Sequence, residues 1–230
     1  KKFGDKLLYS DLQVVIEKNE KVGMIGRNGV GKSTLFGMLT GDDTEFDGEV
    51  KASRGTIIVS TRQEHIGLEH MPVIDYILSE LPKFAELKKT IDDFGKNPSP
   101  SNSQMNKYSD ALDHFGALGY YEVEDSVLRQ LATYQIPEEK ARMPLSKLSG
   151  GQKRFAELVK IAHSNADLIL IDEPTNHMDY IAKEAFIAWV ESVHSKAMLI
   201  ITHDRDVLAK MDRIIDIKDN QAFSYTGNYA

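Results

Sequence analysis

The sequence predicts an α/β fold, and three patterns along its 230 residues lead to that prediction. Two continuous apolar runs, residues 167–172 and 197–202, are typical of strands buried on both faces of a parallel sheet. The middle of the chain has a helical pattern, and strand and helix patterns alternate towards its end. Because 41% of the residues are apolar, the chain can also bury a substantial core.

The first quarter of the chain is rich in strand patterns. Residues 12–17 and 21–26 read as strands around an Asn-Glu turn, and residues 48–53 and 56–60 continue the pattern. We therefore expect an N-terminal antiparallel β subdomain beside the parallel sheet.

A helical pattern follows over residues 73–141. Its apolar residues fall on two helix faces, one with Ile74, Ile77, Leu78 and Leu81 and the other with Leu112, Phe115 and Leu118. Residues 95–103 are rich in Pro, Ser and Asn, which predicts an exposed, mobile loop between helices. We expect one domain in which residues 73–141 form an inserted helical subdomain and residues 1–72 and 142–230 form the core.

Composition limits where the chain works and what it binds. A net charge of −7 argues against a broad nucleic-acid-binding face on this segment. The absence of cysteine suits a reducing interior, so the cytoplasm is the expected location. No run reaches the roughly 18 to 20 apolar residues that span a bilayer, so we expect no direct membrane insertion. The start at Lys1 without Met indicates that the true N-terminus lies further upstream.

Four glycines, a lysine and two hydroxyl residues gather in the segment GRNGVGKSTLFGML, residues 26–39. Its first part matches G-x-x-x-x-G-K-[ST] between an apolar strand and a helix. The matching residues, here called the phosphate loop, are Gly26, Arg27, Asn28, Gly29, Val30, Gly31, Lys32, Ser33 and Thr34.

The chemistry of the phosphate loop fits the phosphates of a nucleotide. Its glycines let backbone N–H groups turn inward, and a helix that starts near Lys32 adds the positive end of its dipole. The Lys32 charge would meet the outer phosphates, and the Ser33 hydroxyl would bind Mg²⁺. The alternative, a Gly-rich turn with an accidental lysine, is disfavoured by the strand and helix on either side.

One carboxylate ends the apolar run at residues 167–172, and a second one begins the turn after it. Asp172 and Glu173 would lie at the carboxyl end of a parallel strand, where open α/β sheets place their ligands. Asp172 suits the metal site, and Glu173 is placed to polarise an attacking water as a general base. A solvated turn is the alternative when the pair is considered alone.

A second glycine-rich helix start occurs at LSGGQ, residues 148–152, here called the signature segment. Ser149, Gly150 and Gly151 form another anion-binding helix terminus, and one nucleotide does not need two. A simple N-cap with neighbouring glycines is the alternative.

Taken together, these motifs resemble the ATP-binding cassette (ABC) family across nearly the whole chain. In order they are GRNGVGKST (26–34), Gln63 after a strand, LSGGQ (148–152), LILIDEP (168–174) and His203 after a strand. The resemblance implies a P-loop NTPase-type parallel sheet core. It also implies that the signature segment, including Gln152, closes over ATP held by the phosphate loop of an opposing cassette. Asp179 is implied as a further nucleotide contact.

The same resemblance implies roles for three isolated residues. Gln63 would contact Mg²⁺ and the attacking water, and His203 would touch the γ-phosphate. Phe3 lies where the family places the aromatic ring that stacks on adenine. The alternatives are an ordinary apolar residue at a frayed end for Phe3 and a histidine satisfied by backbone for His203.

The segment TNHMD, residues 175–179, is similar to the ABC-F branch, whose members carry two fused cassettes and act on the ribosome. Met178 replaces the usual Leu, which conserves volume. The tail YTGNYA, residues 225–230, resembles the end of a first ABC-F cassette. The resemblance therefore implies a second cassette as partner and ribosomal RNA contacts through regions outside this segment. The Gln152-Lys153-Arg154 ending is as much transporter-like as ABC-F-like.

The sequence therefore favours an ATPase cassette that uses ATP and Mg²⁺, closes as a clamp on ATP binding and releases on hydrolysis. The motor subunit of a membrane transporter remains an alternative. A binding clamp with incidental turnover is another, and the intact Glu173 counts against it.

Overall fold

The computed structural model describes residues 1–3, 6–10, 12–61, 65–176 and 178–227. The chain divides into two compact units. The sheet unit comprises Lys1–Gln63 and Asn165–Ala230, and the helical unit comprises Glu64–Ser164.

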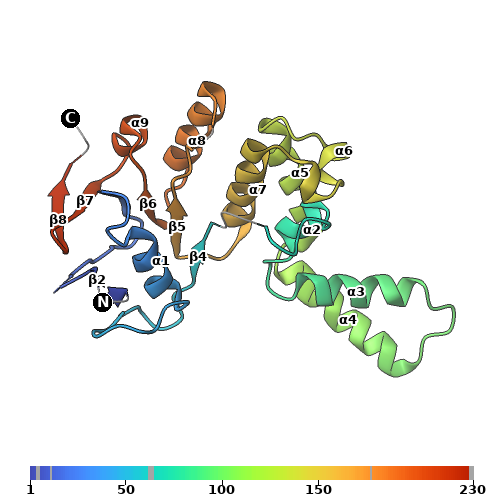
Figure 1. Cartoon of the computed structure of the whole chain (residues 1–230). Helices are drawn as coiled ribbons and strands as arrows, with labels where there is room; N and C mark the ends of the chain where they lie inside the picture. The colour runs from blue at the N-terminus through green and yellow to red at the C-terminus, as the bar shows by residue number, and fades with distance from the viewer. Residues whose placement is uncertain (4–5, 11, 62–64, 177, 228–230) are drawn as a thin grey trace. The chain divides into compact units, whose positions relative to one another are not determined.

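The sheet unit is built on six strands in the order β4-β5-β6-β3-β7-β8 (Figure 1). These are β3 (Lys21–Gly26), β4 (Ile58–Ser60), β5 (Leu168–Asp172), β6 (Ala197–Ile201), β7 (Arg213–Lys218) and β8 (Gln221–Thr226). Neighbours pair in parallel except β7 and β8, which are antiparallel. Asp172 and Met24 both lie opposite Ile201, so the carboxyl ends of three strands meet at one edge.

Helix α1 (Lys32–Thr40) packs beside β4 and covers the main core of the sheet unit. Two further helices, α8 (Tyr180–Ser192) and α9 (Arg205–Leu208), follow strands β5 and β6. The core under α1 contains Leu8, Tyr9, Val22, Met24, Leu35, Phe36, Leu170, Leu199, Ile201, Ile215 and Ile217. Because burying one large apolar side chain contributes about 1.5–3 kcal/mol, this core fixes α1, and with it the phosphate loop, on the sheet.

The predicted parallel α/β core is confirmed, but two of the predicted N-terminal strands are absent from the described residues. Residues 12–17 alternate as expected, since Val14 and Ile16 pack on the core while Val15 is 63% exposed. They form no ladder with any described strand. The alternation therefore predicted correctly which side chains of residues 12–17 face the core. It predicted a paired strand wrongly, because a strand also needs a hydrogen-bonding partner.

The other missing strand, residues 48–53, is exposed throughout and carries an ion pair between Glu49 and Lys51. It buries too little apolar surface to offset the entropy of ordering it in a sheet. The strand predicted at residues 56–60 is shorter in the structure, where it is β4 (Ile58–Ser60). The antiparallel pairing near the N-terminus is limited, among the described residues, to β1 (Lys2–Phe3) with β2 (Lys6–Leu7).

The helical unit contains the predicted run of helices and also the helix that follows the signature segment. In chain order its elements are α2 (Val73–Leu78), α3 (Phe84–Gly95), α4 (Asn102–Ala117), η1 (Tyr120–Glu122), α5 (Val123–Thr133), α6 (Glu138–Ala141), η2 (Leu145–Lys147) and α7 (Gly150–His163). The compact unit is therefore wider than the expected insert at residues 73–141, because α7 packs against α2 and α5.

The first predicted apolar face is confirmed, since Ile74, Ile77, Leu78 and Leu81 are all buried. On the second face Phe115 is buried, but Leu118 is 45% exposed and was assigned wrongly. Leu118 is the C-cap of α4, and the next residue, Gly119, has a φ of 72°. The helix ends there, so its periodicity no longer predicts a buried side chain.

Helices α3 and α4 run side by side as a long hairpin (Figure 1). The loop predicted at residues 95–103 connects them, and α4 then begins with a capping box between Ser101 and Gln104.

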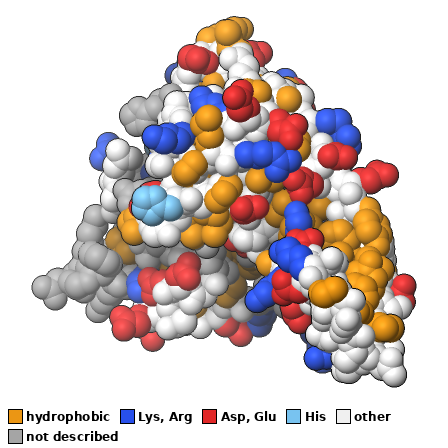
Figure 2. Space-filling model, turned by 90° about the vertical axis from the view of Figure 1, so that its right-hand side faces the viewer, with side chains coloured by type: hydrophobic (Ala, Val, Ile, Leu, Met, Phe, Trp, Pro, Cys, Tyr) orange, Lys and Arg blue, Asp and Glu red, His pale blue; other side chains and the backbone are white. Residues whose placement is uncertain are grey.

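On the surface, Lys and Arg side chains are intermixed with Asp and Glu on the face drawn in Figure 2. None of the helices formed by the described residues is long and apolar enough to cross a membrane.

Candidate active site

The phosphate loop connects β3 to α1, as its sequence predicted. Gly26 ends β3 with a φ of 151°, and a Cβ there would lie 2.7 Å from the Ile217 carbonyl oxygen. Gly31 precedes α1 with a φ of 105° in the left-handed region. Both positions therefore require glycine, and the turn delivers backbone N–H groups to the start of α1.

Lys32 is buried, and its ammonium folds back over the phosphate loop. Its Nζ donates to the carbonyl oxygens of Gly26 at 2.6 Å and Arg27 at 3.2 Å. Among the described residues, no carboxylate forms an ion pair with it. A buried cation that donates to the carbonyl oxygens of its own loop favours a nearby anion, which the phosphates of a nucleotide would supply.

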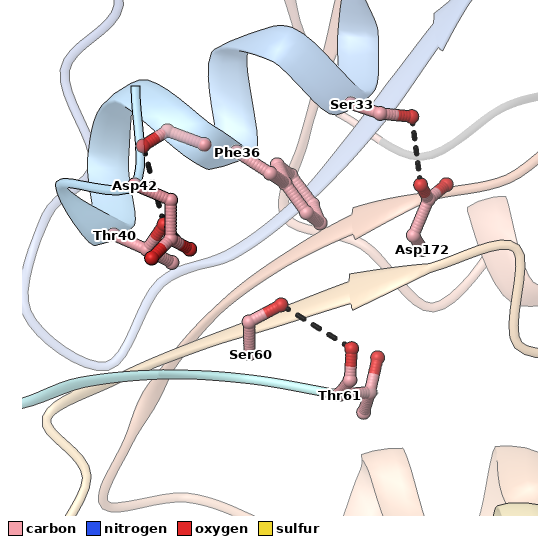
Figure 3. Close-up of a pocket in the computed structure, with 8 residues that line it drawn as sticks. Ser33, Phe36, Thr40, Asp42, Ser60, Thr61 and Asp172 are labelled. Atoms are coloured by element: carbon pink, nitrogen blue, oxygen red, sulfur yellow. Dashed lines mark hydrogen bonds between the residues drawn. The ribbon is translucent and has the colours of Figure 1, made fainter. Parts of the chain in front are cut away.

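Ser33 and Asp172 meet in a pocket of about 230 Å³ beneath α1 (Figure 3). The Ser33 hydroxyl donates to Asp172 Oδ2 at 2.8 Å. The pocket is lined by Ser33, Phe36, Gly37, Thr40, Asp42, Ser60, Thr61 and Asp172. A serine from the start of α1 and an aspartate from the end of β5 thus place two hard oxygen ligands together.

Glu173 follows β5 and lies near His203, which follows β6. Its backbone has a φ of 44°, and its amide donates to the Ile201 carbonyl at 2.9 Å. His203 Nε2 lies 3.7 Å from Glu173 Oε1. A non-glycine residue in the left-handed region stores strain, as residues at functional sites often do.

Burial raises the pKa of the Glu173 carboxyl above its ordinary value. The Asp172 charge acts in the same direction, whereas His203 and Lys32 oppose it. A carboxylate with a raised pKa accepts a proton more readily, which suits a general base.

The signature segment and Asp179 both start helices. Ser149 is the N-cap of α7, and its hydroxyl and the Gln152 side chain form a capping box around the first turn, Gly150 and Gly151. Gln152 Nε2 also donates to the Gln135 carbonyl at 3.3 Å. The Asp179 carboxylate accepts from the Ala182 amide and caps α8. These residues therefore cap their helices. Their contacts with a nucleotide remain a separate proposal.

Two predicted site residues have side chains outside the described part of the structure. Gln63 lies outside the described residues, as does His177 of the TNHMD segment. The backbone of Phe3 pairs in β1, but its side chain lies outside the described part. Their proposed contacts therefore stay predictions.

Sequence reasoning missed Tyr9, which packs against the phosphate loop. Its buried hydroxyl donates to the Gly31 carbonyl oxygen, and burial raises the pKa of this phenol. A Cβ on Gly31 would lie 2.6 Å from Tyr9 Oη. No local motif marks Tyr9, because it reaches Gly31 only through the tertiary fold.

Comparison with known proteins shows which family the chain belongs to. The family model described as ABC transporter matches residues 9–176. The chain belongs to this family. It is therefore an ATP-binding cassette of the ABC type, and the order of the phosphate loop, the signature segment and Asp172-Glu173 is that of the family it resembled.

Two curated relatives extend the match over nearly the whole chain. The uncharacterized ABC transporter ATP-binding protein YfmR of Bacillus subtilis is 31% identical over 100% of this chain. The ATP-binding protein Uup of Escherichia coli is 31% identical over 99% of it. The match to Uup confirms an ABC-F-like cassette. The chain spans only 37% of YfmR and 36% of Uup.

A solved structure supports the fold. A dimeric ATP-binding cassette in a post-hydrolysis state, bound to ADP and Pi, has a TM-score of 0.65 and 20% sequence identity. It covers 97% of this chain, and the match covers 92% of that chain. At this identity the likeness establishes the P-loop NTPase-type fold alone.

The residues present fit ATP and Mg²⁺. Within the described part of the chain, no group of three or more His, Cys, Asp or Glu could hold a metal ion. Mg²⁺ at a nucleotide does not require such a group, because it takes one or two protein ligands together with phosphate oxygens and waters. The paired oxygens of Ser33 and Asp172 beside the Lys32 ammonium meet that requirement.

Proposed function

We propose that this chain is one of two cassettes of an ABC-F-type protein. It hydrolyses ATP at sites shared between the cassettes, and the resulting clamp acts on the ribosome in translation, in the cytoplasm. The observation that carries the hydrolytic part is the set formed by Lys32, Ser33, Asp172, Glu173 and His203 within the sheet unit.

Each member of this set has a distinct task in hydrolysis. The phosphate-loop amides and Lys32 bind the phosphates, and Ser33 and Asp172, with Gln63, would hold Mg²⁺. The metal held there would supply positive charge that offsets the charge of the phosphates. Glu173 takes a proton from the attacking water, and His203, at 3.7 Å from that carboxylate, contacts the γ-phosphate.

Two observations support a second cassette. The signature segment starts a helix of the helical unit and contributes none of the hydrolytic residues, so its glycines remain available for another nucleotide. The chain also covers about a third of Uup, which leaves room there for a second cassette. Asp179 and Phe3 complete the proposed nucleotide contacts.

The ribosomal role is supported by TNHMD, the segment that is similar to the ABC-F branch. With a net charge of −7, this cassette offers little attraction to RNA, so we assign most RNA contacts to regions outside it. The full-length protein with Glu173→Gln, which holds the ATP-closed state, should pellet with ribosomes in ATP. The Lys32→Ala variant should not, because it cannot bind ATP firmly enough to close.

The motor subunit of a membrane transporter is the second candidate, and the description of YfmR as an ABC transporter ATP-binding protein favours it. The same purified protein can be offered ribosomes and membrane fractions in parallel. ATP-dependent pelleting with ribosomes supports the ABC-F role. Tight, salt-resistant binding to a membrane complex with no ribosome binding would replace it with the transporter role.

A further inference from the structure

A buried polar cluster lies inside the helical unit and contains none of the hydrolytic residues. Glu157 on α7 is its centre, with its side chain fully enclosed at 0% residue exposure. Glu157 Oε1 lies 2.7 Å from His65 Nε2 and accepts a hydrogen bond from the Tyr76 hydroxyl. His65 and Tyr76 also pack edge to face, with ring centroids 5.2 Å apart.

Lys160, one turn further along α7, completes this cluster. Its Nζ donates to the Tyr76 hydroxyl at 2.9 Å and lies 3.9 Å from Glu157 Oε2 and 3.2 Å from Glu80 Oε1. It also lies over the Tyr76 ring, 4.4 Å from the centroid. We call Glu157, His65, Tyr76 and Lys160 the buried cluster.

The buried cluster joins three segments of the helical unit. Tyr76 belongs to α2, while Glu157 and Lys160 belong to α7, the helix that begins at the signature segment. His65 lies two residues after Gln63 in the sequence. A single carboxylate thus bonds the segment that follows Gln63 to the helix that presents Ser149.

Stability alone gives a weak reason for such a cluster. Desolvating ionisable side chains is costly, and well-packed apolar residues of similar volume often serve as well or better in a core. A directional contact has a different advantage, because the short bond between His65 and Glu157 fixes the position of one segment relative to the other.

We propose that Glu157 is a positioning residue: through His65 it ties the segment after Gln63 to α7, so that nucleotide binding sensed at Gln63 sets the position of the signature segment. This inference rests on the proposed function, in which Gln63 serves the chain's own site and Ser149 serves the opposing one. The buried cluster then couples the two sites of the clamp.

The test is a double-mutant cycle in the full-length protein with His65→Phe, Glu157→Met and both together, since neither new side chain can form the bond between the two positions. ATP hydrolysis and amide hydrogen exchange, with and without ATP, are measured for each. Each single variant should lower kcat about tenfold with KM for ATP unchanged, a size typical of coupling between sites. The double variant should be no slower than the worse single one, because both remove the same link.

Hydrogen exchange separates positioning from mere structural support. In the unsubstituted protein, ATP should protect the phosphate loop and the first turn of α7. In the variants the phosphate loop should still be protected, while α7 should no longer respond to ATP. Faster exchange in α7 that still responds fully to ATP would show structural support alone and overturn the proposal, as would multiplicative losses in kcat.

Two further variants keep the result decisive. Glu124→Met is the matched control, since Glu124 accepts from Lys88 at 3.0 Å and Arg142 at 3.2 Å in the same unit but outside the buried cluster. It should leave kcat and the α7 response unchanged. If the variants at 65 and 157 fail to fold, Glu157→Asp keeps the carboxylate but shortens its reach towards His65, and a full α7 response in it would overturn the proposal.

Different results would contradict the proposed function and the coupling. Absence of ATP hydrolysis and of phosphate-loop protection in the unsubstituted protein would contradict the proposed function itself. Phosphate-loop protection and hydrolysis with an α7 that ignores ATP would leave that function standing and remove only the coupling.

Discussion

The Ser33 hydroxyl donates to the Asp172 carboxylate at 2.8 Å, although the two residues lie 139 positions apart in the sequence. One comes from the first turn of α1 and the other from the last residue of β5. The fold therefore brings the two oxygens together, and these two residues would hold Mg²⁺.

Replacing Ser33 with Ala should weaken the magnesium dependence of ATP binding. The variant loses one of the two oxygens but keeps Lys32 and the loop amides, so ATP without Mg²⁺ should bind as before. The gain in affinity that Mg²⁺ gives should fall by about tenfold or more. Isothermal calorimetry with ATP, in Mg²⁺ and in EDTA, measures both values.

Ser192→Ala is the matched control for that experiment, since its hydroxyl donates to the Trp189 carbonyl at 2.7 Å within α8 and belongs to no proposed nucleotide or metal contact. It should keep the full magnesium effect. An unchanged magnesium effect in Ser33→Ala would exclude Ser33 as a ligand.

Replacing Glu173 with Gln should slow hydrolysis by about 10²- to 10⁴-fold, because the amide cannot accept the proton of the attacking water. ATP binding should persist, since no phosphate contact is assigned to Glu173. Single-turnover hydrolysis and equilibrium binding measure the two effects separately. Hydrolysis at the unsubstituted rate would require a different base.

The same substitution should stabilise the fold near pH 7. Burial raises the folded-state pKa of Glu173, so the stability that its neutral form contributes at low pH is lost as pH rises through that pKa. Gln cannot ionise and keeps that stability. The Tm of Glu173→Gln should therefore exceed that of the unsubstituted protein at pH 7, and the difference should vanish below about pH 4.

Glu20→Gln provides a control of opposite sign. The hydrogen bond from Arg213, 2.7 Å from Nε to Glu20 Oε1, lowers the pKa of Glu20. Its contribution is present above the unfolded pKa and is lost as pH falls, so Glu20→Gln should lower Tm at pH 7. Tm shifts of the same sign in both variants would contradict the assigned environments.

Gly31→Ala should destabilise the chain by about 1–3 kcal/mol and weaken ATP binding. The φ of 105° disfavours Ala, and its Cβ would collide with Tyr9 Oη. Chemical denaturation measures the stability. Gly55→Ala separates the two causes, because Gly55 has a φ of 85° with nothing within 4 Å of the added Cβ. A loss no larger than that of Gly55→Ala would show that Tyr9 does not restrict Gly31.

The phosphate loop, the strand that ends at Asp172 and the start of α1 were predictable because each depends on local sequence. Glycines at fixed spacing, a continuous apolar run and a helix start can all be recognised without knowing the fold. Ser33 and Asp172 were both assigned to the metal site, because open α/β sheets place their ligands at the carboxyl ends of the strands.

Tyr9, Leu118 and residues 12–17 were not predictable in this way. Tyr9 contacts Gly31 only through the tertiary fold. Leu118 is exposed, against the prediction, because α4 ends there. Residues 12–17 show that alternation records which side chains face a core, whereas a strand also depends on a partner distant in sequence.

The shared ATP site is the central claim, and mixing two inactive chains tests it most directly. Lys32→Ala damages a chain's own nucleotide site, and Ser149→Arg damages only the site it completes in a neighbour. Each variant alone should be nearly inactive in ATP hydrolysis. Circular dichroism checks that Ser149→Arg, which also loses the cap of α7, remains folded.

The decisive measurement is the hydrolysis rate of the two variants mixed at high concentration, with dimer formation followed by light scattering. One site of the mixed dimer combines an intact Lys32 with an intact Ser149, so part of the activity should return. A folded, monomeric Ser149→Arg chain that hydrolyses ATP at the unsubstituted rate would contradict the shared site.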